Sequence, residues 1–437
     1  MLKQNLKINL NNFLNNDIQL SKLSNNITLI TERMEKIYSL SLGIWLYEGS
    51  RDEDQDLIGI SHFTEHMFFK GTLNKTALEI AKIIDSLGGN IDAFTSKESV
   101  CFYGNFLEEH FSIAAELFSD LLINPALDPI ETEKERNVII EEIKSIEDSP
   151  AELLFDLFCQ NFWDSHPLGQ PISGSIESVQ KITNTDIKNF FINKFYPNNM
   201  IITVAGSLDH KKIHQIAEQY FGKFNKSENT KSPRTKPNNN SFIQLINKNQ
   251  LEQVHICLGT IGYPAADEKR YAYSLFNTIL GESMSSRLFQ KIREEKGLVY
   301  SISSLINTFS DTGLTAIYLA TSKENAKKAL KLTSEEIIKL KNELVDDAEL
   351  DRAKQHLRGN LLLGLESSSN RMVNVAKQYI YLGKFIAVNE VVENLNSVTK
   401  DAIKEIANEL FQNKYLACAI IGDVESLGIN KEELSWE

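Results

Sequence analysis

Apolar stretches recur in the same order in the two halves of the chain. The first half opens with YSLSLGIWLYEG (38–49) and closes with NMIITVAGSLD (199–209), and the second opens with VHICLGTIGY (254–263) and closes with YLACAIIGDVE (415–425). Each stretch has the length and composition of a buried strand, and helical patterns lie between them. The repeated order predicts a duplicated α+β fold, with two similar α+β domains that each combine an antiparallel or mixed sheet with packed helices.

A polar stretch divides the chain near its middle. NKSENTKSPRTKPNNNS (225–241) contains two prolines and no residue that needs burial, which is typical of a solvated linker. We therefore expect an N-terminal domain at 1–224, a linker at 225–241 and a C-terminal domain at 242–437.

The segment TALEIAKIIDSLGG (76–89) has the period of an amphipathic helix. Positions 78, 81, 84, 85 and 87 form its expected inner face, and the pair Gly88 and Gly89 ends it. The following NIDAFTSKESVCFYGNFL (90–107) alternates and is rich in aromatic and β-branched residues. It is predicted to be a strand or a hairpin.

The composition is that of an ordinary folded protein, with 42% hydrophobic and 24% charged residues over 437 positions. Lys and Arg total 46 against 59 for Asp and Glu, which gives a net charge of −13. This balance argues against a general nucleic-acid binder and favours cationic partners. The four cysteines form no CxxC motif, so a cysteine zinc cluster is excluded and each is expected to be a small buried residue.

No run of about 18 apolar residues occurs, so we expect no membrane span. The start MLKQNLKINLNNFLNND lacks the apolar core of a secretory signal, and the cytoplasm is the expected compartment. Because this start has Lys3 and Lys7 and no acid before Asp17, a cryptic targeting segment is the alternative, with an organellar or periplasmic location.

The stretch GISHFTEHMFFKGT (59–72) holds two histidines four residues apart with Glu65 between them. On a helix, His62 and His66 share one face and could bind one metal ion, and Glu65 leans over the same face. Two histidines at this spacing can also be ordinary half-buried side chains. A hydrolytic zinc site would need a third protein ligand.

The segment ERNVIIEEIKSIEDSP (135–150) could supply that ligand. It is expected to be helical, with apolar positions 138, 139, 140, 143 and 146 facing inward and carboxylates at Glu135, Glu141 and Glu142. Glu135 and Glu142 are seven residues apart and share one helix face. The residues alone leave the ligand undecided, since each of these acids could also be a solvated surface group.

The order HxxEH is that of the inverzincins. Together with the Glu142 of VIIEEI, it resembles the pitrilysin (M16) family of zinc peptidases, and most closely the short processing-peptidase (M16B) branch. Five further stretches agree with that branch: GSRDE (49–53), GGNIDAFTSKE (88–98), EDSPAELLFD (147–156), HPLGQPISGS (166–175) and SSRLFQKIREEKGLVYSIS (285–303). The resemblance implies one Zn²⁺ per chain bound by His62, His66 and Glu142, with Glu65 as general base and Glu135 as a possible accessory acid.

The resemblance also implies substrate-binding residues. Arg293 and Tyr300 match donors that could hold a peptide carbonyl or its oxyanion, and Asp92 and Ala93 match a strand that pairs with the substrate backbone. The family usually has Asn where this chain has Asp92, so a donor is exchanged for an acceptor.

The function that the resemblance implies is that of a zinc metallo-endopeptidase acting on peptides or on unfolded, processing-type polypeptides. Glu65 would take a proton from the attacking water and pass it to the leaving amine. The expected partner is a second copy or a related chain, giving a homodimer or a heterodimer. The rivals are a non-catalytic scaffold subunit and a catalytic subunit that needs a different, inactive partner.

Overall fold

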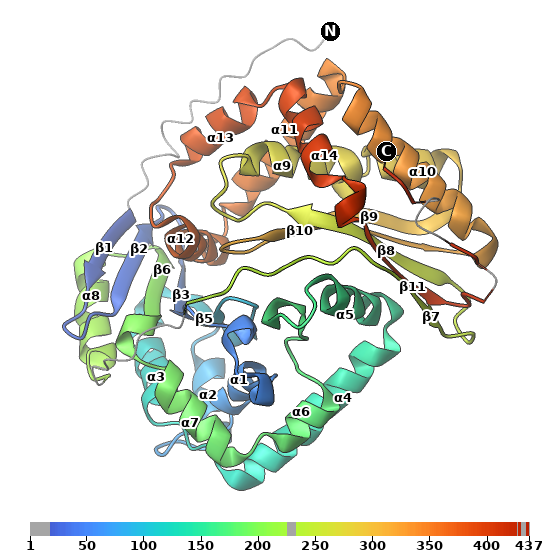
Figure 1. Cartoon of the computed structure of the whole chain (residues 1–437). Coiled ribbons are helices and arrows are strands. Elements are labelled where there is room, and N and C mark those ends of the chain that lie inside the picture. Colours follow the sequence, from blue (N-terminus) through green and yellow to red (C-terminus); the bar gives the residue numbers. More distant parts are fainter. Residues whose placement is uncertain (1–17, 225–232, 426, 430–433, 437) are drawn as a thin grey trace.

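The computed structural model describes residues 18–224, 233–425, 427–429 and 434–436. Figure 1 shows two sheets, one built from the first half of the chain and one from the second half, each with helices packed on it. The mixed α+β class predicted from the sequence is confirmed.

The first sheet contains strands whose order is β1-β2-β6-β3-β5-β4. Neighbouring strands are antiparallel except β2 and β6, which are parallel. The strands are β1 (Ile18–Lys22), β2 (Thr28–Arg33), β3 (Ser39–Leu46), β4 (Asn90–Thr95), β5 (Val100–Leu107) and β6 (Met200–Gly206).

The second sheet repeats this arrangement, with the order β7-β11-β8-β10-β9. Its strands are β7 (Ile243–Asn247), β8 (Val254–Gly262), β9 (Val299–Thr308), β10 (Gly313–Thr321) and β11 (Ala417–Gly422). β7 and β11 are parallel and the other pairs are antiparallel, so β2 to β6 correspond to β7 to β11 in both chain order and position. The predicted duplication is present in the topology, and β4 and β9 are equivalent edge strands.

The helices of the first half cover the first sheet and continue beyond it. They are α1 (Ile60–Phe68), α2 (Ala77–Ser86), α3 (Phe111–Ile123), α4 (Pro129–Asp148), α5 (Pro150–Phe162), α6 (Ile176–Lys181), α7 (Asn184–Lys194) and α8 (His210–Phe221). Those of the second half are α9 (Arg270–Asn277), α10 (Lys323–Asn342), α11 (Asp347–Gly364), α12 (Ser368–Leu382), α13 (Val388–Ser397) and α14 (Lys400–Leu410).

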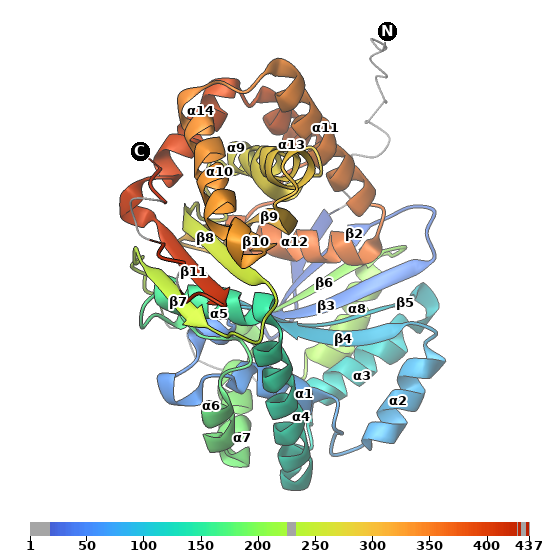
Figure 2. The ribbon, with the colours of Figure 1, turned by 90° about the vertical axis from the view of Figure 1, so that its right-hand side faces the viewer.

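Each half covers one face of the other half's sheet with a helix of its own. α5 packs against β8 and β11, while α12 packs against β3 and β6 (Figure 2). Glycines permit the close approach: a Cβ on Gly43 would lie 2.3 Å from Sδ of Met372, and one on Gly259 would lie 2.6 Å from Cζ of Phe158. Separating the halves would expose these apolar faces to water.

The linker is only partly described, because residues 225–232 lie outside the described ranges. Within the described part, Arg234 forms ion pairs with Asp52 at 2.6 Å and with Glu98 at 3.1 Å. The side chain of Arg234 is 12% exposed, so this part of the segment is anchored rather than fully solvated. The division of the chain at 225–241 stays a prediction.

The inner faces of two helices differ from the sequence prediction. On α2, Ile80 and Leu87 are buried, whereas Leu78 is 64% exposed. On α4, Ile139 is buried and Val138 is 49% exposed. A helical period predicts that apolar residues recur along a face, but the neighbouring element decides which arc of the helix is covered.

The four cysteines are buried and unpaired, as expected. Among the described helices, none combines the length and the apolar character needed to cross a bilayer. The possible targeting segment at the start of the chain lies outside the described residues.

Candidate active site

The HxxEH segment lies on α1, whose first turn is fixed by its surroundings. Gly59 precedes the helix with φ +96°, and a Cβ there would lie 2.7 Å from the carbonyl oxygen of Ser173, so both conformation and space require glycine. The Glu53 carboxylate accepts hydrogen bonds from the backbone N–H groups of Gly59 and Ser61, both at 2.8 Å. Burial raises the pKa of Glu53 to about 7.

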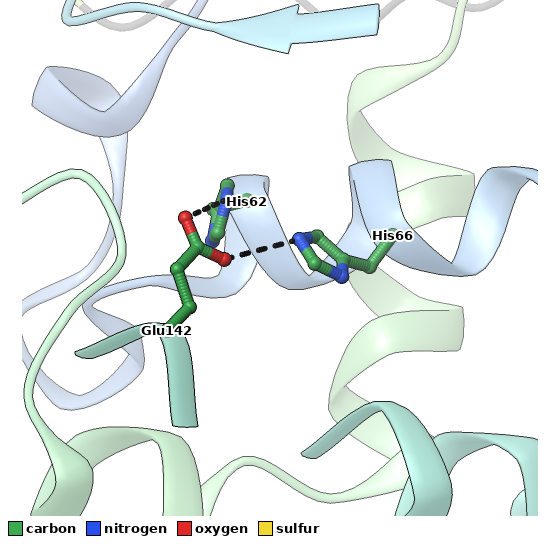
Figure 3. A group of neighbouring side chains, drawn as sticks. All are labelled: His62, His66 and Glu142. Atoms are coloured by element: carbon green, nitrogen blue, oxygen red, sulfur yellow. Dashed lines mark ion pairs between the residues drawn. The ribbon is translucent and has the colours of Figure 1, made fainter. Parts of the chain in front are cut away.

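His62, His66 and Glu142 converge at one point between α1 and α4 (Figure 3). Nε2 of His62 lies 3.7 Å from Oε1 of Glu142, and Nε2 of His66 lies 3.6 Å from its Oε2. One ligand atom from each of the three residues lies within 4.8 Å of the others. α1 and α4 are in contact, and Phe63 and Ile139 belong to one buried cluster.

This donor set fits a zinc ion. Ligands bonded at about 2.0–2.2 Å in a tetrahedral arrangement lie about 3.3–3.6 Å apart, close to the separations from Glu142 to the histidines. Burial, and then His66, lower the pKa of His62 to about 4, so His62 is neutral near pH 7 as a metal ligand must be. The interaction with His66 holds the pKa of Glu142 below its usual value, although burial acts in the opposite direction.

Glu135 lies behind His66 rather than beside the other donors. Its Oε2 accepts a hydrogen bond from Nδ1 of His66 at 3.2 Å, and its Oε1 pairs with Nζ of Lys70 at 2.5 Å. A carboxylate in this position fixes the histidine tautomer and leaves Nε2 free to bind a metal. Glu141 instead points to solvent, where it pairs with Lys144. The structure thus separates three acids that the sequence left equivalent.

Glu65 faces the same region and is held by a residue of the neighbouring edge strand. Oγ1 of Thr95, at the end of β4, donates a hydrogen bond to Oε2 of Glu65 at 2.6 Å. Burial raises the pKa of Glu65, and the hydrogen bond from Thr95 acts in the opposite direction. A partly buried carboxylate with a raised pKa has the properties of a general base that works near neutral pH.

A cavity of about 1180 Å³ adjoins this cluster and is lined by His62, Glu65 and Glu142. Its other walls come from both halves: β4 and the following turn, α5, β9 and the C-terminal end of α12. Small-molecule pockets usually have about 300–1,000 Å³, so this one has room for a segment of peptide. The charged side chains lining it are Glu65, Glu98, Glu142, Glu152, Asp156, Lys97 and Lys377.

The four predicted substrate-binding residues are divided between two regions. Ala93 lines the cavity beside the donor cluster, and Asp92 is an exposed neighbour on the same strand. Arg293 and Tyr300 do not occur among the described residues that line the cavity. Tyr300 is 77% exposed, and the guanidinium of Arg293 lies 5.9 Å from its ring centroid. This chain by itself therefore does not bring the pair to the donor cluster.

Sequence reasoning missed the groups that hold the site in place. Glu53 at the start of α1 and Thr95 beside Glu65 stand in stretches that carry the family resemblance, GSRDE and DAFTSKE. Nothing in their spacing indicates which side chains they contact, because both contacts join segments that are separate in sequence. Only the resemblance of these stretches could have singled them out.

Two family models match the chain. The one described as Insulinase (Peptidase family M16) matches residues 28–175, and the one described as Peptidase M16 inactive domain matches residues 181–357. A protein of Bacillus subtilis named "Uncharacterized zinc protease YmxG" is 35% identical over 397 residues, which cover 91% of this chain and 96% of that protein. Its name points to zinc, in agreement with the donor set.

Solved structures share the fold. A protease from Helicobacter pylori has a TM-score of 0.86 at 22% identity and covers 93% of this chain and 99% of its own. A structure from Pseudomonas fluorescens, described as a peptidase M16 inactive domain, has a TM-score of 0.87 at 21% identity and covers 93% of this chain and 98% of its own.

Proposed function

Because this chain belongs to the M16 family of zinc peptidases, we propose that it is a zinc-dependent endopeptidase that cleaves peptides or unfolded, processing-type polypeptides. The observation that carries the proposal is the convergence of His62, His66 and Glu142 next to Glu65 at the wall of a peptide-sized cavity. A non-catalytic scaffold would have no need of this combination.

In the proposed mechanism, His62, His66 and Glu142 hold one zinc ion per chain, and Glu135 orients His66. Zinc supplies Lewis-acid polarisation of the scissile carbonyl and lowers the pKa of water. Glu65 accepts a proton from the attacking water at a carboxylate oxygen and donates it to the amine of the leaving peptide. Thr95 keeps the carboxylate of Glu65 in one orientation.

The substrate is proposed to bind as an added strand along β4. This strand is an edge of its sheet, so its outer backbone groups are free to pair with a peptide, and Ala93 lies at the cavity wall. Five carboxylates against two lysines line the cavity, namely Glu65, Glu98, Glu142, Glu152 and Asp156 against Lys97 and Lys377. The excess of acid favours basic substrates, and Asp92 adds an acceptor beside the strand.

Zinc-dependent cleavage tests this function. We expect the purified protein to release fragments from a random peptide mixture, to lose this activity with a chelator and to regain it with added Zn²⁺. The fragments, identified by mass spectrometry, would give the cleavage preference. An intact mixture after incubation with the zinc-loaded protein would leave the scaffold role, or the need for a different partner subunit, as the remaining explanations.

We further propose that Arg293 and Tyr300 act on the substrate of a second chain. The exposure of Tyr300 and the position of the pair outside this chain's cavity support a homodimer, or a pair with a related chain, that completes each site in trans.

Tyr300→Phe is expected to lower kcat by about 10²-fold, because it removes a donor to the developing oxyanion and nothing else. Steady-state kinetics on a peptide of about 15 residues, with zinc content measured in parallel, checks this expectation. Tyr38→Phe is the matched control, since Tyr38 is 85% exposed and lies on the other half of the chain. An unchanged kcat for Tyr300→Phe would remove this residue from the active site.

A further inference from the structure

The turn between β4 and β5 connects the general base to a buried acid. Thr95, which donates to Glu65, is followed three residues later by Glu98, which is 1% exposed. Glu98 accepts hydrogen bonds from Nη1 of Arg51 at 2.7 Å and from Oγ of Ser310 at 2.6 Å. The backbone N–H of Ser310 donates to its other oxygen at 2.9 Å.

The second half of the chain supplies much of this binding. Ser310 and Asp311 belong to the turn between β9 and β10. Asp311 accepts two hydrogen bonds from the guanidinium of Arg51, at 2.8 and 2.6 Å. Arg234, from the segment between the halves, pairs with Glu98 at 3.1 Å. We call these five residues, Arg51, Glu98, Arg234, Ser310 and Asp311, the Glu98 cluster.

The turn that carries Glu98 has little freedom of its own. The backbone N–H of Ser50 donates to the carbonyl of Ser96 at 3.0 Å, and that of Arg51 donates to Lys97 at 2.8 Å. A Cβ on Gly49 would lie only 2.3 Å from the carbonyl oxygen of Ser96. Displacement of the Glu98 cluster would therefore move the whole turn, including its first residue neighbour, Thr95.

A buried ion cluster could serve stability alone. Burying charges costs solvation, however, and replacing such clusters with apolar side chains often leaves a protein as stable or more stable. Stability is therefore a weak explanation for a cluster that joins three parts of the chain at this turn. The short connection to Thr95 gives it a more specific role.

We infer that Thr95 is a positioning residue for Glu65, and that the second half of the chain fixes Thr95 through the Glu98 cluster. This inference rests on the proposed role of Glu65 as general base. It gives the second half a part in catalysis within one chain, separate from Arg293 and Tyr300. The hydroxyl of Thr95 touches the base and not the reacting atoms.

The first test compares Thr95→Val with Thr95→Ser. Valine keeps the shape and removes the donor, so kcat should fall by about 10- to 100-fold, as when other orienting partners are removed, while KM and zinc content stay near wild type. Serine keeps the donor and should restore most of kcat. A merely structural role predicts instead that both variants change thermal stability and zinc content together with activity.

The second test asks whether Asp311 acts through Thr95. Asp311→Asn should lower kcat several-fold in the wild-type background and have almost no further effect in the Thr95→Val background, since coupled residues are not additive. Ser310→Ala, which removes one donor to Glu98, replaces Asp311→Asn if that variant does not fold. Asp347→Asn is the control, because it breaks an exposed pair with Lys400.

The outcomes separate this inference from the proposed function. If the wild type shows no zinc-dependent cleavage, the proposed function fails and the inference fails with it. If the wild type is active and Thr95→Val keeps the same kcat, only the positioning role is overturned. Additive effects of Thr95→Val and Asp311→Asn on kcat would overturn the link to the second half.

Discussion

Glu65→Gln is expected to abolish peptide cleavage while the protein keeps its zinc. The amide has nearly the shape of the carboxylate but cannot accept the proton of the attacking water, so kcat should fall by about 10²- to 10⁴-fold. Oγ1 of Thr95, now 2.6 Å from the carboxylate, can still donate to the amide oxygen, and the donor cluster is not altered. Cleavage rates and elemental analysis on the same preparation measure both parts of this expectation.

Glu141→Gln is the matched control for this variant. Glu141 lies on α4 beside the proposed ligand Glu142, but its side chain is 72% exposed and pairs with Lys144. The control removes one carboxylate near the site and should leave kcat unchanged. Near wild-type cleavage by Glu65→Gln would mean that another group is the base, and Glu135 would be the first to test because it contacts His66.

His62→Ala is expected to lose both zinc and activity. The change removes one of three proposed ligands and leaves only His66 and Glu142, so zinc affinity should fall by more than about 100-fold, beyond the loss typical of an outer-shell partner. Competition with a chelator of known affinity measures the change. Circular dichroism should show an intact fold, because the core contacts of α1 come from other residues such as Phe63 and Met67.

His356→Ala serves as the control for zinc binding. His356 is an exposed histidine of α11 that contacts Asn360, and it has no carboxylate group around it comparable to Glu142. It should retain wild-type zinc. Full zinc occupancy in His62→Ala would place the metal elsewhere and make the HxxEH motif a coincidence of sequence.

Much of the fold was predictable from the sequence. The opening and closing strands of each half, β3, β6, β8 and β11, lie where continuous apolar stretches predicted them. Apolar content of this kind reports burial on both faces of a strand, whatever its neighbours are. The repeated order of these stretches was enough to predict a duplicated α+β fold, which the common strand order of the two sheets bears out.

The candidate site was predictable only as far as its local spacing and its resemblance reached. His62 and His66 share a face because four residues make about one helical turn, and this holds in any context. For the third ligand, the spacing of α4 could not choose among Glu135, Glu141 and Glu142. Packing of α4 against α1 directs Glu142 toward both histidines, Glu135 behind His66 and Glu141 to solvent. The roles of these residues stay predictions until the variants are measured.

The sequence by itself determined the local elements, the i, i+4 pair on α1 and the duplicated order of strands, because these depend on residues near one another along the chain. Tertiary structure decided that α5 and α12 are exchanged between the halves, that Thr95 meets Glu65, and that the turn holding Asp311 reaches Arg51. It also left Tyr300 exposed outside the cavity. The physical reason is that periodicity encodes which residues are buried, whereas contacts between distant segments depend on how whole elements fit together in space.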